Sequence, residues 1–119
     1  MTPATDWPTA LVAACRGTGV SAAYQPIVDV AHGYTAGYEA LARFDDPNRL
    51  GPERWFAAAR AHGVHADLEA AALRAALGSR ADLPGNTFLT VNVSPDLLAT
   101  EQIRAVWRDQ ATSVGWSSS

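Results

Sequence analysis

Three residues of one predicted strand combine side chains suited to a cation and to a phosphate. Glu39, Leu41 and Arg43 occupy alternate positions of an apolar run, and alternate residues of a strand project from the same face. A carboxylate suits a hard divalent cation, and a guanidinium suits a phosphate. Burial of both groups costs free energy unless they are paired or used. The pattern therefore indicates either a ligand site or a structural ion pair between Glu39 and Arg43.

A second oxygen ligand follows much later in the chain. Glu39 and Asn92 both lie toward the C-terminal ends of predicted strands, and this end of the strands holds the active site in α/β barrels. A carboxylate oxygen and an amide oxygen both suit Mg²⁺ or Mn²⁺. An asparagine at this place is equally typical of a turn or a helix cap. Taken alone, the pair is a weak signal for a metal site.

Other polar residues have structural interpretations. His62 and His65 have the spacing of metal ligands, but Gly63 interrupts the helix that would align them, so we expect an exposed loop. Asp45 and Asp46 are expected in a solvated turn, and Trp55 in the core.

The elements that would position these residues alternate between strands and helices. We expect strands at 22–29, 36–44 and 87–93, and helices at 6–16, 52–63, 66–80 and 94–108. The link at 30–35 is too short for a parallel crossover, which needs about a dozen residues or more. The first two strands are therefore predicted to form an antiparallel hairpin at the start of an α/β sheet or barrel.

Composition excludes several classes of protein. The 119 residues suffice for one small domain, and the net charge of −3 without a basic block argues against broad nucleic-acid binding. Cys15 is the single cysteine, so no internal disulfide can form, which favours a reducing cytoplasm. No segment approaches the ~18 apolar residues of a membrane span, and the N-terminus lacks the features of a signal peptide. We therefore expect a cytoplasmic protein without a membrane segment in this chain.

Three segments together resemble the beginning of an EAL domain. They are Tyr24 to Asp29, Gly37 to Arg43 and Val91 to Pro95, and their order and spacing match that family over about residues 21–106. EAL domains are phosphodiesterases that hydrolyse cyclic-di-GMP to linear pGpG in bacterial signalling, or inactive relatives that bind the nucleotide or a protein. The resemblance implies a TIM-like barrel whose first strand is antiparallel to the second.

The resemblance also implies roles for single residues. Glu39 and Asn92 would be ligands of Mg²⁺ or Mn²⁺, and no catalytic group beyond these ligands is retained. Leu41 would line the nucleotide pocket, Arg43 would contact a phosphate of cyclic-di-GMP, and Gln25 would lie at the pocket floor.

The length of the chain departs from the family. A (β/α)₈ barrel usually needs ~250 residues, and the family's later acidic and lysine motifs are absent from this sequence. We therefore expect an incomplete barrel of about three strands that does not hydrolyse cyclic-di-GMP alone, so that its status as an enzyme stays open. The expected organisation is a lead-in helix at 1–20, a truncated EAL domain at 21–110 and an atypical tail at 111–119.

Alternative interpretations concern the tail and the role of the chain. A GC-rich stretch coding for a fourth strand, read one base out of frame, would give the residues from Thr112 to Ser119, which suggests a frameshifted gene remnant. A degenerate EAL module for nucleotide sensing or protein interaction is the other alternative. Unpaired sheet edges and an uncovered apolar face further predict self-association.

Overall fold

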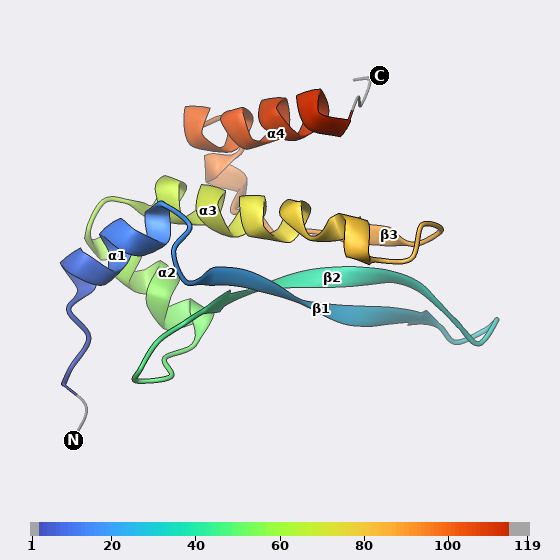
Figure 1. Cartoon of the computed structure of the whole chain (residues 1–119), viewed down its shortest axis with the longest axis horizontal. Coiled ribbons are helices and arrows are strands. Elements are labelled where there is room, and N and C mark those ends of the chain that lie inside the picture. Colours follow the sequence, from blue (N-terminus) through green and yellow to red (C-terminus); the bar gives the residue numbers. More distant parts are fainter. Residues whose placement is uncertain (1–2, 115–119) are drawn as a thin grey trace.

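An antiparallel hairpin forms the centre of the computed structural model, which describes residues 3–114 (Figure 1). Strand β1 (Val20–Asp29) pairs with β2 (Tyr34–Phe44), as predicted, and both strands begin two residues earlier than expected. The Asp29 side chain accepts hydrogen bonds from two N–H groups of the turn, and Gly33 there has a φ of 71°. Because β1 is an edge strand of the β1-β2-β3 sheet, Pro26 costs little ladder bonding.

Strand β3 (Phe88–Thr90) pairs in parallel with β2 and is shorter than the predicted strand at 87–93. The ladder ends where Glu39 pairs with Thr90. The alternation of side chains nevertheless continues, because Val91 and Val93 pack against the helices. Packing, and not strand pairing, produces the apolar period that suggested a longer strand.

Three helices precede β3. Helix α1 (Trp7–Cys15) begins at Asp6, whose side chain accepts a hydrogen bond from the Thr9 N–H, and α2 (Pro52–Ala61) begins with a proline as expected. Helix α3 (His65–Gly78) ends earlier than predicted and continues into the 3₁₀ turn η1 (Arg80–Asp82). The Tyr24 hydroxyl donates to the Ala76 carbonyl over 2.6 Å and joins β1 to α3.

The single helix predicted at 94–108 is wrong. Residues Pro95–Leu97 form the 3₁₀ turn η2, and α4 covers Glu101–Val114. The Thr100 hydroxyl donates to the Leu97 carbonyl and accepts from the Ile103 N–H, so a cap separates the two pieces. The end of the predicted tail, residues 115–119, lies outside the described residues.

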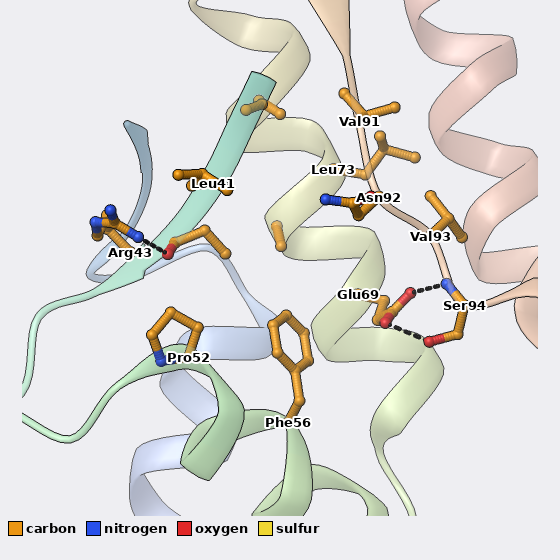
Figure 2. Close-up of a pocket in the computed structure, with 14 residues that line it drawn as sticks. Leu41, Arg43, Pro52, Phe56, Glu69, Leu73, Val91, Asn92, Val93 and Ser94 are labelled. Atoms are coloured by element: carbon orange, nitrogen blue, oxygen red, sulfur yellow. Dashed lines mark hydrogen bonds between the residues drawn. The ribbon is translucent and has the colours of Figure 1, made fainter. Parts of the chain in front are cut away.

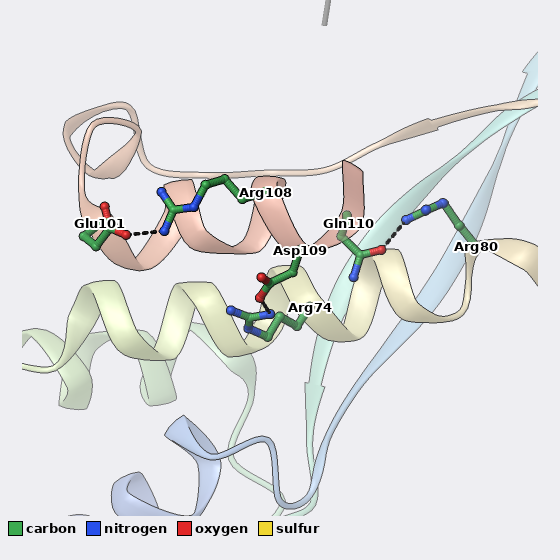
Figure 3. Close-up of polar contacts among 6 residues, drawn as sticks. All are labelled: Arg74, Arg80, Glu101, Arg108, Asp109 and Gln110. Carbon is green, nitrogen blue, oxygen red and sulfur yellow. Dashed lines mark hydrogen bonds and ion pairs between the residues drawn. The ribbon is translucent and has the colours of Figure 1, made fainter. Parts of the chain in front are cut away.

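Helix α4 packs on the side of α3 that is turned away from the hairpin (Figure 1). Leu73 and Leu77 of α3 meet Ile103 and Val106 of α4 in one buried cluster. Polar contacts around this interface join Arg74 with Asp109 and Arg80 with Gln110, each at 2.6 Å, and Glu101 with Arg108 (Figure 3). Exposed ion pairs contribute little stability, so the apolar cluster holds α4 in place.

A second core joins α1, α2 and α3 around Trp55, which is 4% exposed, as predicted for this residue. Its ring stacks on Phe44 with centroids 4.8 Å apart and meets Trp7 edge-on. Asp46 is buried and accepts a hydrogen bond from the Trp55 indole over 3.2 Å. The expectation of a solvated turn was therefore wrong for Asp46, because the indole N–H needs an acceptor inside this core.

Both cores lie on one side of the sheet. No helix of the described part packs on the other side of the middle of β1 and β2 (Figure 1). Within residues 3–114, no helix has the length and apolar character of a membrane span.

Candidate functional site

The register of the hairpin places the predicted site residues on one face. Gln25 is paired with Glu39, and Glu39 is paired with Thr90, so these side chains project together. Leu41 and Arg43 follow at alternate positions of β2 and share this face. Because the intervening position Ala40 pairs with Tyr24, which bonds to α3, the shared face is turned away from α3. We call it the open face.

A cleft of about 400 Å³ lies where β2 and the segment after β3 separate (Figure 2). It brings together Leu41, Arg43 and Asn92, whereas Glu39 and Gln25 do not line it and lie farther along the open face. The remaining lining residues come from β2, α2, α3 and the segment after β3: Ala40, Ala42, Pro52, Phe56, Glu69, Ala72, Leu73, Ala76, Val91, Val93 and Ser94.

The ion pair between Glu39 and Arg43, considered above as the alternative to a ligand site, does not form. Within residues 3–114, the Glu39 carboxylate has no hydrogen bond or ion pair. The Arg43 guanidinium is exposed and donates over 3.0 Å to the carbonyl of Ala42. Both groups are therefore accessible and the costly burial considered above does not arise, because no described element covers the open face.

Asn92 lies two residues beyond the Thr90 position that pairs with Glu39. Since Val91 and Val93 pack toward the helices, the exposed Asn92 side chain lies on the opposite side of the segment. Glu39 and Asn92 thus offer two hard oxygen donors on neighbouring segments of the polypeptide, β2 and the residues after β3. Their chemistry fits part of the ligand set of Mg²⁺ or Mn²⁺, although no group of three or more metal-binding His, Cys, Asp or Glu side chains occurs among residues 3–114.

Two further residues lie near the site: Glu69, which was not among the predicted site residues, and His65, which was expected elsewhere. Glu69 of α3 accepts hydrogen bonds from the N–H and the hydroxyl of Ser94, at 2.9 and 2.8 Å (Figure 2). His65 was wrongly expected in an exposed loop: it is the first residue of α3 and its side chain is only 13% exposed. Its Nε2 lies 3.3 Å from Glu69 Oε1 without the alignment of a hydrogen bond. The spacing of four residues between His65 and Glu69 on one helix was the available signal.

Comparisons with solved structures place this arrangement among known folds. The EAL domain of Xanthomonas citri FimX, in complex with c-diGMP, is 23% identical, with a TM-score of 0.73 over 92% of this chain and 44% of that one. The PaMucR phosphodiesterase, a c-di-GMP complex, is 20% identical, with a TM-score of 0.74 over 93% and 47%. Klebsiella pneumoniae BlrP1, in a manganese and cyclic diGMP complex, is 25% identical, with a TM-score of 0.64 over 84% and 25%.

The chain thus spans less than half the length of each of these proteins. The three-stranded sheet with its helices matches part of their fold, which agrees with the predicted incomplete barrel and its antiparallel first strand. None of the curated proteins matches this sequence. The family model of the EAL domain matches residues 9–114, which is most of the sequence. The chain therefore belongs to the EAL domain family.

Proposed function

We propose that this chain supplies one part of the site of an EAL-type cyclic-di-GMP phosphodiesterase domain. The observation that carries the proposal is the open face, on which Glu39, Leu41 and Arg43 project together beside Asn92. Within the described part of the chain, no other side chain neutralises the Glu39 carboxylate or the Arg43 guanidinium. Family membership supplies the ligand class, because relatives of known structure were solved with the nucleotide bound.

Each residue has a role that suits its chemistry. Arg43 turns its guanidinium from the Ala42 carbonyl to a phosphate of the nucleotide, since a phosphate accepts two of its hydrogen bonds. Leu41 offers apolar surface to a base, and Gln25, exposed on the same face, donates or accepts at the ligand edge. Glu39 and Asn92 would hold Mg²⁺ or Mn²⁺. Such an ion would polarise a phosphodiester and lower the pKa of a bound water.

We further propose that the 119-residue polypeptide binds the nucleotide without turning it over. Among the described residues, Glu39 and Asn92 are the two oxygen donors proposed for the ion, so that waters and phosphate oxygens would have to complete its octahedral set. The carboxylate that lines the cleft, that of Glu69, is engaged by the N–H and the hydroxyl of Ser94 and is not free to act as a general base. Nucleotide sensing without hydrolysis is therefore the second candidate function. The proposal places the protein in the cytoplasm, where this second messenger acts in the family.

Titration of the isotope-labelled chain with cyclic-di-GMP tests the proposal. We expect shifts of the NMR resonances of Leu41 and Arg43, which Arg43→Ala abolishes and Arg60→Ala leaves unchanged. Arg60 is the matched control because it is an exposed arginine at the end of α2 outside the cleft. Shifts that persist in Arg43→Ala, or that map to the helices alone, would refute the proposed site. Metal-dependent release of pGpG by the pure chain would refute the absence of turnover.

Self-association is a separate proposal. Within residues 3–114, the outer edge of β3 has no neighbouring strand, and Phe88 on this strand is 49% exposed. Open edges and exposed apolar side chains favour association. Sedimentation at increasing concentration should show growing species, and a monomer at every concentration would contradict this proposal.

A further inference from the structure

The segment that carries Asn92 lacks the support of a sheet. Ladder pairing ends with Glu39 and Thr90, two residues before Asn92. Val91 and Val93 pack on the helix cores, but apolar packing alone does not fix the direction of the polar side chain between them. Metal ligands generally depend on a second layer of groups that holds them in place. A ligand role of Asn92 therefore requires a group that fixes the backbone on the C-terminal side of this residue.

Glu69 is that group. Its two carboxylate oxygens accept from the backbone N–H and from the hydroxyl of Ser94, at 2.9 and 2.8 Å, two residues after Asn92 (Figure 2). The Glu69 side chain is only 11% exposed and belongs to α3, whose neighbouring residue Leu68 is fully buried. Hydrogen bonds to an ionised carboxylate are about twice as strong as neutral ones. A rigid helix thus holds the irregular segment at one point.

We propose that Glu69 is a positioning residue for Asn92: by fixing Ser94 it directs the Asn92 amide oxygen to the side of the open face where Glu39 lies. The inference rests on the proposed function, because it takes Asn92 as a ligand. Glu69 itself is no ligand in this arrangement, since both of its oxygens are engaged with Ser94 and Asn92 lies between Val91 and Val93, which face the helices.

The grouping of Ser94, Glu69 and His65 is not a nucleophilic triad. In such a triad the imidazole lies between the acid and the hydroxyl and removes the proton from the hydroxyl. Here the carboxylate lies in the middle: it accepts from the Ser94 hydroxyl and has His65 Nε2 at 3.3 Å. Within residues 3–114, no imidazole therefore accepts from the Ser94 hydroxyl, which serves to hold the segment.

Hydrogen exchange and backbone ¹⁵N relaxation of the full chain without ligand test the positioning role. In Glu69→Ala we expect the Ser94 amide to exchange at least about tenfold faster, because it loses a hydrogen bond to a charged acceptor. The Asn92 backbone should become mobile, while the Thr90 and Ile103 amides keep their protection. Glu69→Gln should restore most of the protection, since its amide oxygen can still accept from the Ser94 N–H. Glu101→Ala, which removes an exposed carboxylate from α4, is the control. It should change neither the exchange rate of the Ser94 amide nor the mobility of the Asn92 backbone.

The outcomes separate three cases. If the amides of Ser94, Thr90 and Ile103 all lose protection to the same extent, Glu69 contributes only to general stability and the proposal is overturned. An unchanged exchange rate of the Ser94 amide would overturn it as well. Mn²⁺ then distinguishes the inference from the function on which it rests. We expect Mn²⁺ to broaden the Asn92 side-chain resonance in the native chain and less so in Glu69→Ala. Broadening absent from Asn92 and Glu39 in the native chain would refute the ligand role, and with it the proposal, even if Ser94 is loosened.

Discussion

Polar side chains on the two sides of the sheet differ in whether they have hydrogen-bond partners within the fold. On the helix side, Tyr24 donates to the Ala76 carbonyl, Asp46 accepts from the Trp55 indole, and Glu69 accepts twice from Ser94. On the open face, neither Glu39 nor Asn92 makes a side-chain hydrogen bond within the described part of the chain. These groups of the helix side have partners in the fold, whereas Glu39 and Asn92 of the open face remain available to a ligand.

This difference separates stability from function in a testable way. Removing a satisfied group on the helix side leaves its buried partner unsatisfied, which costs more than the bond itself contributes. Removing an exposed group from the open face leaves nothing unsatisfied. Substitutions on the two sides should therefore differ in their effect on the free energy of unfolding and, in the opposite sense, in their effect on ligand binding.

The largest effect is expected for Trp55→Ala. The ring is 4% exposed and packs between Phe44 and Trp7. Loss of a buried large aromatic side chain typically costs about 3–5 kcal/mol, which is comparable to the whole free energy of unfolding of a small domain. We expect largely unfolded protein in circular dichroism spectra. The exposed Phe88→Ala is the control and should stay folded. A cooperative melt of Trp55→Ala near that of the native chain would remove the main support for the helix-side core.

A smaller effect is expected for Tyr24→Phe. This change removes only the hydroxyl that donates over 2.6 Å to Ala76 and leaves a carbonyl of α3 without that donor. The free energy of unfolding should fall by about 1 kcal/mol, as for a single hydrogen bond. Urea titration measures the loss, and Tyr34→Phe, on an exposed residue of the hairpin, should change stability far less. Equal values for both would contradict a structural role of the Tyr24 hydroxyl.

The parts of the fold that depend on neighbouring residues could be predicted from the sequence. A short link required the hairpin, and Pro52 marked the start of α2. The end of β3 was missed because Val91 and Val93 keep the period of a strand while they pack on helices. The break between η2 and α4 was missed because Thr100 forms its cap within an otherwise helical pattern.

The residues of the candidate site also differ in whether the sequence could indicate them. The resemblance to the family supplied Gln25, Glu39, Leu41, Arg43 and Asn92, and the register of β2 explains why four of them share a face. No local pattern joins Glu69 to Ser94, which are 25 residues apart and meet only when α3 packs beside β3. Contacts of this kind depend on tertiary packing, which spacing in the sequence does not encode.

Glu39→Gln tests the comparison between the two sides of the sheet with a residue of the open face. We expect the free energy of unfolding to change by less than about 0.5 kcal/mol, because the carboxylate has no partner in the described part of the chain and ordinary surface substitutions fall in this range. Broadening of nearby NMR resonances by Mn²⁺ should nevertheless disappear, since a neutral amide is a weaker ligand. A loss of stability as large as that of Tyr24→Phe would show that Glu39 has a structural partner after all.

The smallest effect concerns Cys15, at the end of α1 on the helix side. Burial raises the pKa of this thiol, and the negative charge of Asp67 raises that pKa further. Because the thiolate is the reactive form, iodoacetamide at pH 8 should modify Cys15 more slowly in the native chain than in urea. Asp67→Asn should speed the reaction slightly in the folded state, since burial remains the larger cause, and Asp96→Asn, on the distant η2 turn, should not. Equal rates in the native chain and in urea would mean that α1 does not pack as the helix-side core requires.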